Sequence, residues 1–154
     1  MKIDYFKIPK ITVSYTDTVK TSERLLVLSP FDVLSFLNNI YKGCMQHHEE
    51  FHVLYLNKNN KALGITNISK GGMDNCDVDV RIILQTALIS NSSKIILIHN
   101  HPSGNAIPSK QDINITMNIN KSCKLIGIEL VDHIILTSES YVSLVDSGYI
   151  DVQN

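Results

Sequence analysis

An uninterrupted apolar run in the second half of the chain most constrains its fold. Residues Lys94–Ile98 read Lys-Ile-Ile-Leu-Ile, without the polar alternation of a strand that has one face in water. Such a run is typical of a strand that is covered on both faces. Helix-like and strand-like segments alternate around it, so we predict an α/β fold with a mixed central sheet flanked by helices.

The other elements are predicted from caps, turns and apolar spacing. One helix is expected to begin at Ser29-Pro30, a cap followed by a first-turn proline, and to end near Gly43. Asp79 and Ser109 are expected to cap two more helices, and Leu88 is placed on the buried face of the first of these. The predicted strands are 51–56, 63–69, 94–98, 128–137 and 141–144, the first two joined by a polar turn as a hairpin.

The start of the chain shows the least pattern. Residues 1–28 are expected to form an N-terminal arm or an edge strand, and residues 29–154 one domain. Residues 70–75, which contain Gly71-Gly72, are predicted to form a flexible loop.

Composition excludes several classes of protein. With a formal net charge of -1, nothing draws the whole chain toward nucleic acid or acidic membranes. The cysteines Cys44, Cys76 and Cys123 are far apart and odd in number, which fits reduced thiols. Since we find neither a signal-peptide core nor a membrane-spanning apolar run, we expect a soluble, cytoplasmic protein.

Two histidines follow the apolar run directly. His99 and His101 are two residues apart, so an extended backbone would point both imidazoles to one side of the sheet. Pro102 favours that conformation at His101, and Asp112 arrives at the start of a predicted helix. Two imidazoles and one carboxylate suit Zn²⁺ and leave a fourth position for water, as in catalytic zinc sites.

Ser109 and Asp112 also have a simpler interpretation. Their spacing matches a capping box, in which the acidic residue reaches back to the cap amide. An Asp side chain is short for that reach, and we expect that one carboxylate cannot easily serve both zinc and the cap. Ser109 either caps the helix alone or presents its hydroxyl to an oxyanion near the metal.

Activating a zinc-bound water requires a base, and Glu49 and Glu50 precede the predicted strand 51–56. Side chains alternate between the faces of a strand, so only one of the two can point toward the metal. The simpler interpretation of both is a solvated strand entrance.

These residues together resemble the JAB/MPN (JAMM) metalloprotease domain, in particular its RadC-like bacterial branch. The family pattern is a Glu on an upstream strand, then His-x-His-Pro, then a Ser and, three positions on, an Asp. This chain matches it at Glu49, His99, His101, Pro102, Ser109 and Asp112. Further similar stretches are 51–57, 68–72, 78–81, 126–136 and 141–144, so the resemblance spans residues 45–150.

The resemblance implies a cytidine-deaminase-like sheet sandwiched by helices, with Zn²⁺ on His99, His101 and Asp112. It implies Glu49 as the general base, because the family spacing Glu-x-Phe fits Glu49 and Phe51. Ser109 carries over as the hydroxyl that steadies the tetrahedral intermediate.

Two features depart from the family. Val80 and Ile82 stand where Pro and Glu are common, and we expect consequences for helix packing more than for chemistry. Full-length RadC proteins carry an N-terminal helix-hairpin-helix module, for which the first 45 residues are too short. The family's association with DNA repair therefore loses its most obvious DNA-binding element.

Other candidate residues have simpler explanations. A polar strand entrance accounts for His47 and His48, and a hydrogen-bonded core position for His133. Gly71-Gly72 lacks the context of a phosphate-binding loop, and Cys123 has no positioned base that would make it a nucleophile.

The sequence thus predicts a zinc metallohydrolase, a peptidase or isopeptidase acting on a peptide or protein substrate. A non-catalytic protein-interaction module and a DNA-associated RadC-like factor remain as alternatives. Salt-dependent affinity for DNA would identify the latter.

Overall fold

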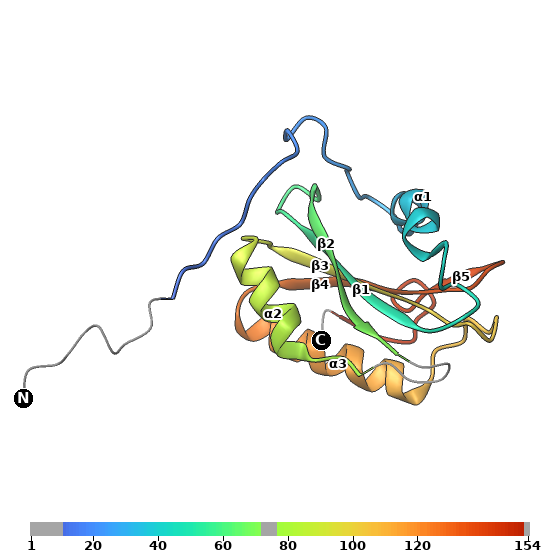
Figure 1. Cartoon of the computed structure of the whole chain (residues 1–154). Coiled ribbons are helices and arrows are strands. Elements are labelled where there is room, and N and C mark those ends of the chain that lie inside the picture. Colours follow the sequence, from blue (N-terminus) through green and yellow to red (C-terminus); the bar gives the residue numbers. More distant parts are fainter. Residues whose placement is uncertain (1–10, 72–76, 153–154) are drawn as a thin grey trace, which may run out of the picture.

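The computed structural model describes residues 11–71 and 77–152, which build a five-stranded sheet of order β2-β1-β3-β4-β5 (Figure 1). β1 is antiparallel to both β2 and β3, β3 is parallel to β4, and β5 is antiparallel to β4. The predicted mixed sheet of an α/β fold is confirmed. The elements in chain order are α1 (Pro30–Tyr41), β1 (Glu50–Leu56), β2 (Ala62–Lys70), α2 (Val80–Ile89), β3 (Lys94–Asn100), α3 (Lys110–Leu125), β4 (Glu129–Leu136) and β5 (Tyr141–Ser143).

Helices cover both faces of the sheet, α1 on one and α2 with α3 on the other (Figure 1). On β1, Leu54 and Leu56 pack in the core with Leu37 of α1. Their neighbours Val53 and Tyr55 pack in the opposite core, against α2 and α3. Successive β1 side chains therefore enter different layers, and this alternation separates the functional groups described below.

Most predicted elements agree with the structure within one or two residues. The central strand is longer than expected, because β3 continues through Asn100 and so includes His99. On α2, Asp79 caps the helix as predicted, and its side chain accepts a hydrogen bond from the Arg81 amide. The expectation for Leu88 was wrong: its side chain is 57% exposed, because the sheet is covered only by the Ile83 and Ala87 side of the helix.

The N-terminal region meets the sheet at few points. Residues 11–25 form no helix or strand, and Leu26 makes an isolated bridge with Lys61. The Tyr15 hydroxyl donates to the Leu63 carbonyl at 2.8 Å. Residues 1–10 of the expected arm, and most of the expected 70–75 loop with Gly72, lie outside the described residues. None of the helices within 11–71 and 77–152 has the length and apolarity needed to cross a bilayer.

Candidate metal centre

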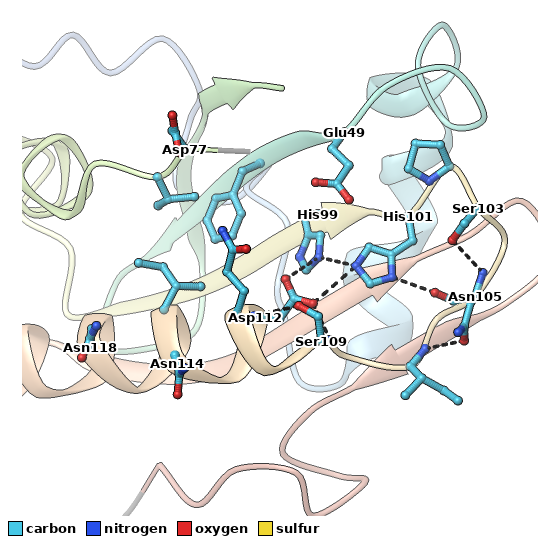
Figure 2. Close-up of a pocket in the computed structure, with 16 residues that line it drawn as sticks. Glu49, Asp77, His99, His101, Ser103, Asn105, Ser109, Asp112, Asn114 and Asn118 are labelled. Atoms are coloured by element: carbon cyan, nitrogen blue, oxygen red, sulfur yellow. Dashed lines mark hydrogen bonds and ion pairs between the residues drawn. The ribbon is translucent and has the colours of Figure 1, made fainter. Parts of the chain in front are cut away.

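A cavity of about 700 Å³ opens where β1 begins and β3 ends, beside the start of α3 (Figure 2). All five predicted site residues line it: Glu49, His99, His101, Ser109 and Asp112. The structure therefore brings together groups that are more than 60 positions apart along the chain.

The donor atoms of the two histidines and Asp112 converge on one point. The Nε2 atoms of His99 and His101 lie 2.8 Å apart. Asp112 Oδ1 lies 3.3 Å from Nε2 of His99, and Oδ2 lies 3.5 Å from Nε2 of His101. The chemistry of this set, two imidazoles and one carboxylate, fits a zinc ion with an open position.

Hydrogen bonds on the far side of each ring fix where the imidazole protons lie. His101 Nδ1 is 2.7 Å from the Asn105 carbonyl oxygen. A carbonyl only accepts, so Nδ1 carries the proton and Nε2 of neutral His101 keeps its lone pair toward the cavity.

A longer chain of hydrogen bonds determines which ring nitrogen of His99 carries the proton. Thr116 Oγ1 donates to the Asp112 carbonyl, so it accepts from Nδ1 of His133 at 2.6 Å. His133 Nε2 is then an acceptor and takes the proton of His99 Nδ1 at 2.7 Å. Nε2 of His99 is left unprotonated and also faces the cavity.

Two lone pairs 2.8 Å apart repel each other unless a cation lies between them. Burial lowers the pKa of His99 and lowers that of His133 further, so neither ring is readily charged. Burial also opposes the charged form of His101, but hydrogen bonds to Asp112 and Asn105 raise its pKa overall. The arrangement thus favours a cation between the Nε2 atoms of His99 and His101.

Asp112 takes part in the helix cap and also faces the two histidines. Its Oδ2 accepts from the Ser109 amide at 2.7 Å, and the Ser109 hydroxyl accepts from the Asp112 amide at 3.1 Å. The expectation that an Asp side chain is short for the reach to the cap was wrong, and the same carboxylate also faces the two imidazoles. The cap uses Oδ2 from the Ser109 side, while both oxygens remain turned to the histidines. Burial disfavours the Asp112 carboxylate, but the bonds to His101 and His99 lower its pKa strongly overall.

Glu49 and Glu50 point to opposite faces of the sheet. Glu49 is half-buried, lines the cavity, and extends its carboxylate toward His99 and His101 in Figure 2. Glu50 lies on the α1 side and is only 7% exposed. A solvated strand entrance is therefore wrong for Glu50, whose buried carboxylate contacts His48, Asn67 and Lys70 instead.

Residues that orient the site were missed or undervalued from the sequence. The expectation of a hydrogen-bonded core position for His133 is confirmed, but its link to His99 follows from the parallel β3–β4 pairing. Thr116 stands one helical turn after Asp112, a spacing that could have signalled it. Cys123 lies on the buried side of α3, and burial raises its pKa to about 11, which agrees with an inert thiol.

Asn100 was also missed, although it stands between the two histidines. It points to the other face and is fully buried. Its amide nitrogen donates to the carbonyls of Cys44, Met45 and His48 at 3.3, 3.1 and 2.9 Å, and its oxygen accepts from the Glu50 amide at 2.8 Å. One side chain thus fastens the connection between α1 and β1, which includes Glu49, to the end of β3.

Comparison with known proteins agrees with this geometry. A family model described as the RadC-like JAB domain matches residues 27–149. A UPF0758 protein of Staphylococcus haemolyticus is 37% identical over 133 residues, which are 86% of this chain and 58% of the relative. A UPF0758 protein of Clostridium beijerinckii is 41% identical over 124 residues, 80% of this chain and 53% of the relative. The chain spans a little over half the length of these relatives. It belongs to the RadC-like JAB domain family.

Proposed function

We propose that the chain is a zinc-dependent metallohydrolase of the peptidase or isopeptidase class. One observation carries the proposal: the Nε2 atoms of His99 and His101 lie 2.8 Å apart beside the Asp112 carboxylate. Hydrogen bonds that lead away from the cavity hold this arrangement, so it does not depend on solvent. A zinc ion bound to these three residues would polarise the scissile carbonyl and acidify water.

The remaining residues take roles that fit their positions. Glu49, at the cavity wall, accepts a proton from the attacking water and delivers it to the leaving amine. Ser109 uses its hydroxyl oxygen for the helix cap, which leaves its hydroxyl proton available to an oxyanion. The partly buried Asp112 stays ionised, because its contacts with the two imidazoles lower its pKa.

The cavity lining supports a polar, uncharged or cationic substrate. Its polar lining consists of the carboxylates of Glu49, Asp77 and Asp112 and the side-chain amides of Asn105, Gln111, Asn114 and Asn118. Among residues 11–71 and 77–152, no Lys or Arg lines it. This lining suits the amide groups of a peptide better than the phosphates of DNA. The proposed compartment remains the cytoplasm, where thiols stay reduced.

Zinc content is the first test. Purified wild type is expected to hold about one zinc ion at this centre, and His101→Ala to lose it. Failure of the wild type to take up zinc after reconstitution would contradict the hydrolase and favour the protein-interaction module.

Turnover is the second test, with a panel of fluorogenic peptides and isopeptide-linked dipeptides. Glu49→Gln should retain zinc at His101 yet lower kcat by about 10²–10⁴-fold, the usual contribution of a general base. Glu129→Gln is the matched control, because this exposed carboxylate lies at the opposite end of the parallel strands. Equal turnover by Glu49→Gln and wild type would remove Glu49 from the mechanism.

A further inference from the structure

A second cluster of metal-ligating side chains lies on the other face of the sheet, under α1. It consists of Cys44 and His48 in the α1–β1 connection and Glu50 at the first position of β1. One ligand atom from each residue lies within 4.8 Å of the other two. None of the three lines the cavity of the first centre.

The contacts around Glu50 show how the cluster is arranged. Its Oε1 lies 3.0 Å from Nε2 of His48 and 3.2 Å from Nζ of Lys70. Its Oε2 accepts from Asn67 at 2.7 Å and lies 3.6 Å from Nε2 of His52. The carboxylate is thus buried, held in one orientation and surrounded by groups that favour its charge.

One ligand of the cluster, Cys44, and one neighbour of the cluster, Lys70, are loosely held. The Cys44 thiol is buried, and its hydrogen-bond contact is a distant one, 3.7 Å to the Tyr41 carbonyl. The side chain of Lys70 is 67% exposed, so its ammonium group can withdraw into water. A cation of higher charge could therefore replace Lys70 without disturbing the core.

The backbone of the cluster is fixed independently of its side chains. Asn100 bonds to the carbonyls of Cys44 and His48 and to the amide of Glu50. Ligand atoms of a tetrahedral zinc site lie roughly 3.3–3.8 Å apart, as follows from bond lengths of about 2.0–2.3 Å. The partly exposed ring of His48 can close the difference by rotating.

We propose that Cys44, His48 and Glu50 form a second metal site of thiolate, imidazole and carboxylate ligands, which takes Zn²⁺ or a similar borderline cation. Binding releases the thiol proton to solvent and displaces Lys70. His48 and Glu50 flank Glu49, so the cation would fix the backbone of that residue. This last consequence depends on the proposed hydrolase, whereas the site itself does not.

Sulfur distinguishes the two sites, because the His99, His101 and Asp112 centre contains none. The test titrates metal-free, reduced protein with Co²⁺ and follows the near-ultraviolet thiolate-to-cobalt absorption band. Wild type is expected to bind two equivalents and to show the band. His101→Ala should lose one equivalent and keep the band, so failure of either site is seen separately.

Variants locate the thiolate. Cys44→Ser should lose the band and bind one equivalent of Co²⁺ fewer. His48→Gln changes a partly exposed side chain and should weaken the band, so it provides the test if Cys44→Ser does not fold. Cys123→Ser and Cys76→Ser are the matched controls and should keep the band. Lys70→Gln should bind the second Co²⁺ about tenfold more tightly, since one nearby like charge is removed.

Two results would overturn the second site. The first is wild type that shows no thiolate band at excess Co²⁺. The second is a band that survives Cys44→Ser or disappears in Cys76→Ser.

Discussion

The two faces of the sheet carry similar donor atoms in different electrostatic settings. On the α3 face, His99, His101 and Asp112 converge beside an open cavity, with two lone pairs turned to each other. On the α1 face, the Glu50 carboxylate already lies 3.2 Å from the Lys70 ammonium group and within hydrogen-bonding distance of His48. The first arrangement favours a cation beside an open cavity, whereas the second can exist with or without one.

Asn100 joins the two faces, so its loss is expected to have the largest effect on stability. Asn100→Ala removes four hydrogen bonds to backbone groups, two of them buried and two partly buried. We expect the free energy of unfolding to fall by about 3 kcal/mol, because unsatisfied buried groups cost about 1–3 kcal/mol each and part of the loop can relax. Urea denaturation measures this change.

Asn118→Ala is the control for that experiment, since Asn118 is exposed on α3. A similar loss in both variants would mean that Asn100 does not fasten the α1–β1 connection in any special way.

The proton relay on the α3 face provides the next test. Thr116→Val removes the acceptor of His133 Nδ1, so His133 can place its proton on Nε2 and force that of His99 toward the metal. Zinc affinity, measured by competition with a chelator, is expected to fall about 10–100-fold. Thr116→Ser keeps the hydroxyl and should restore most of the affinity. Wild-type affinity in Thr116→Val would show that the relay does not set the tautomer.

Glu50 tests the charge balance of the α1 face in the presence of chelator. Burial opposes its charge, but hydrogen bonds from His48 and Lys70 lower its pKa overall. Such a group stabilises the fold above its unfolded pKa of about 4.3 and loses this effect as pH falls through the lowered folded pKa. Glu50→Gln should therefore destabilise by about 1–2 kcal/mol at pH 7 and by less in acid. A loss that is independent of pH would argue for packing instead of charge.

Asp132 has a raised pKa, in contrast to Glu50, and its substitution is expected to change the free energy of unfolding least. It is 5% exposed, and burial raises its pKa although the amides of His133 and Val145 donate to it. Its folded form holds a proton more tightly than the unfolded chain, so stability falls as pH rises from about 3.9 through the raised pKa. Asp132→Asn should stabilise the protein at pH 7 by less than about 1 kcal/mol and flatten this dependence in urea unfolding. Destabilisation at pH 7 would show that the ionised carboxylate is needed.

Local patterns were sufficient to predict the elements and much of the first centre. The apolar run before His99 predicted a doubly covered strand, and the caps at Ser29, Asp79 and Ser109 predicted three helix starts. These signals depend on neighbours within a few residues, where spacing alone determines direction. For the same reason, His99 and His101 could be predicted to share a face.

Other features depend on which strands pair and were decided only by the tertiary structure. The contact of His133 with His99 requires β4 beside β3, and the two roles of Asp112 require α3 at one specific position. From the sequence, Cys44 was interpreted as a reduced thiol and His48 and Glu50 as a polar strand entrance, and only the fold brings their ligand atoms together under α1. The sequence by itself determined the periodicity, the caps and the ligand types. The proton positions and the division between the two faces depend on long-range register, which no local pattern encodes.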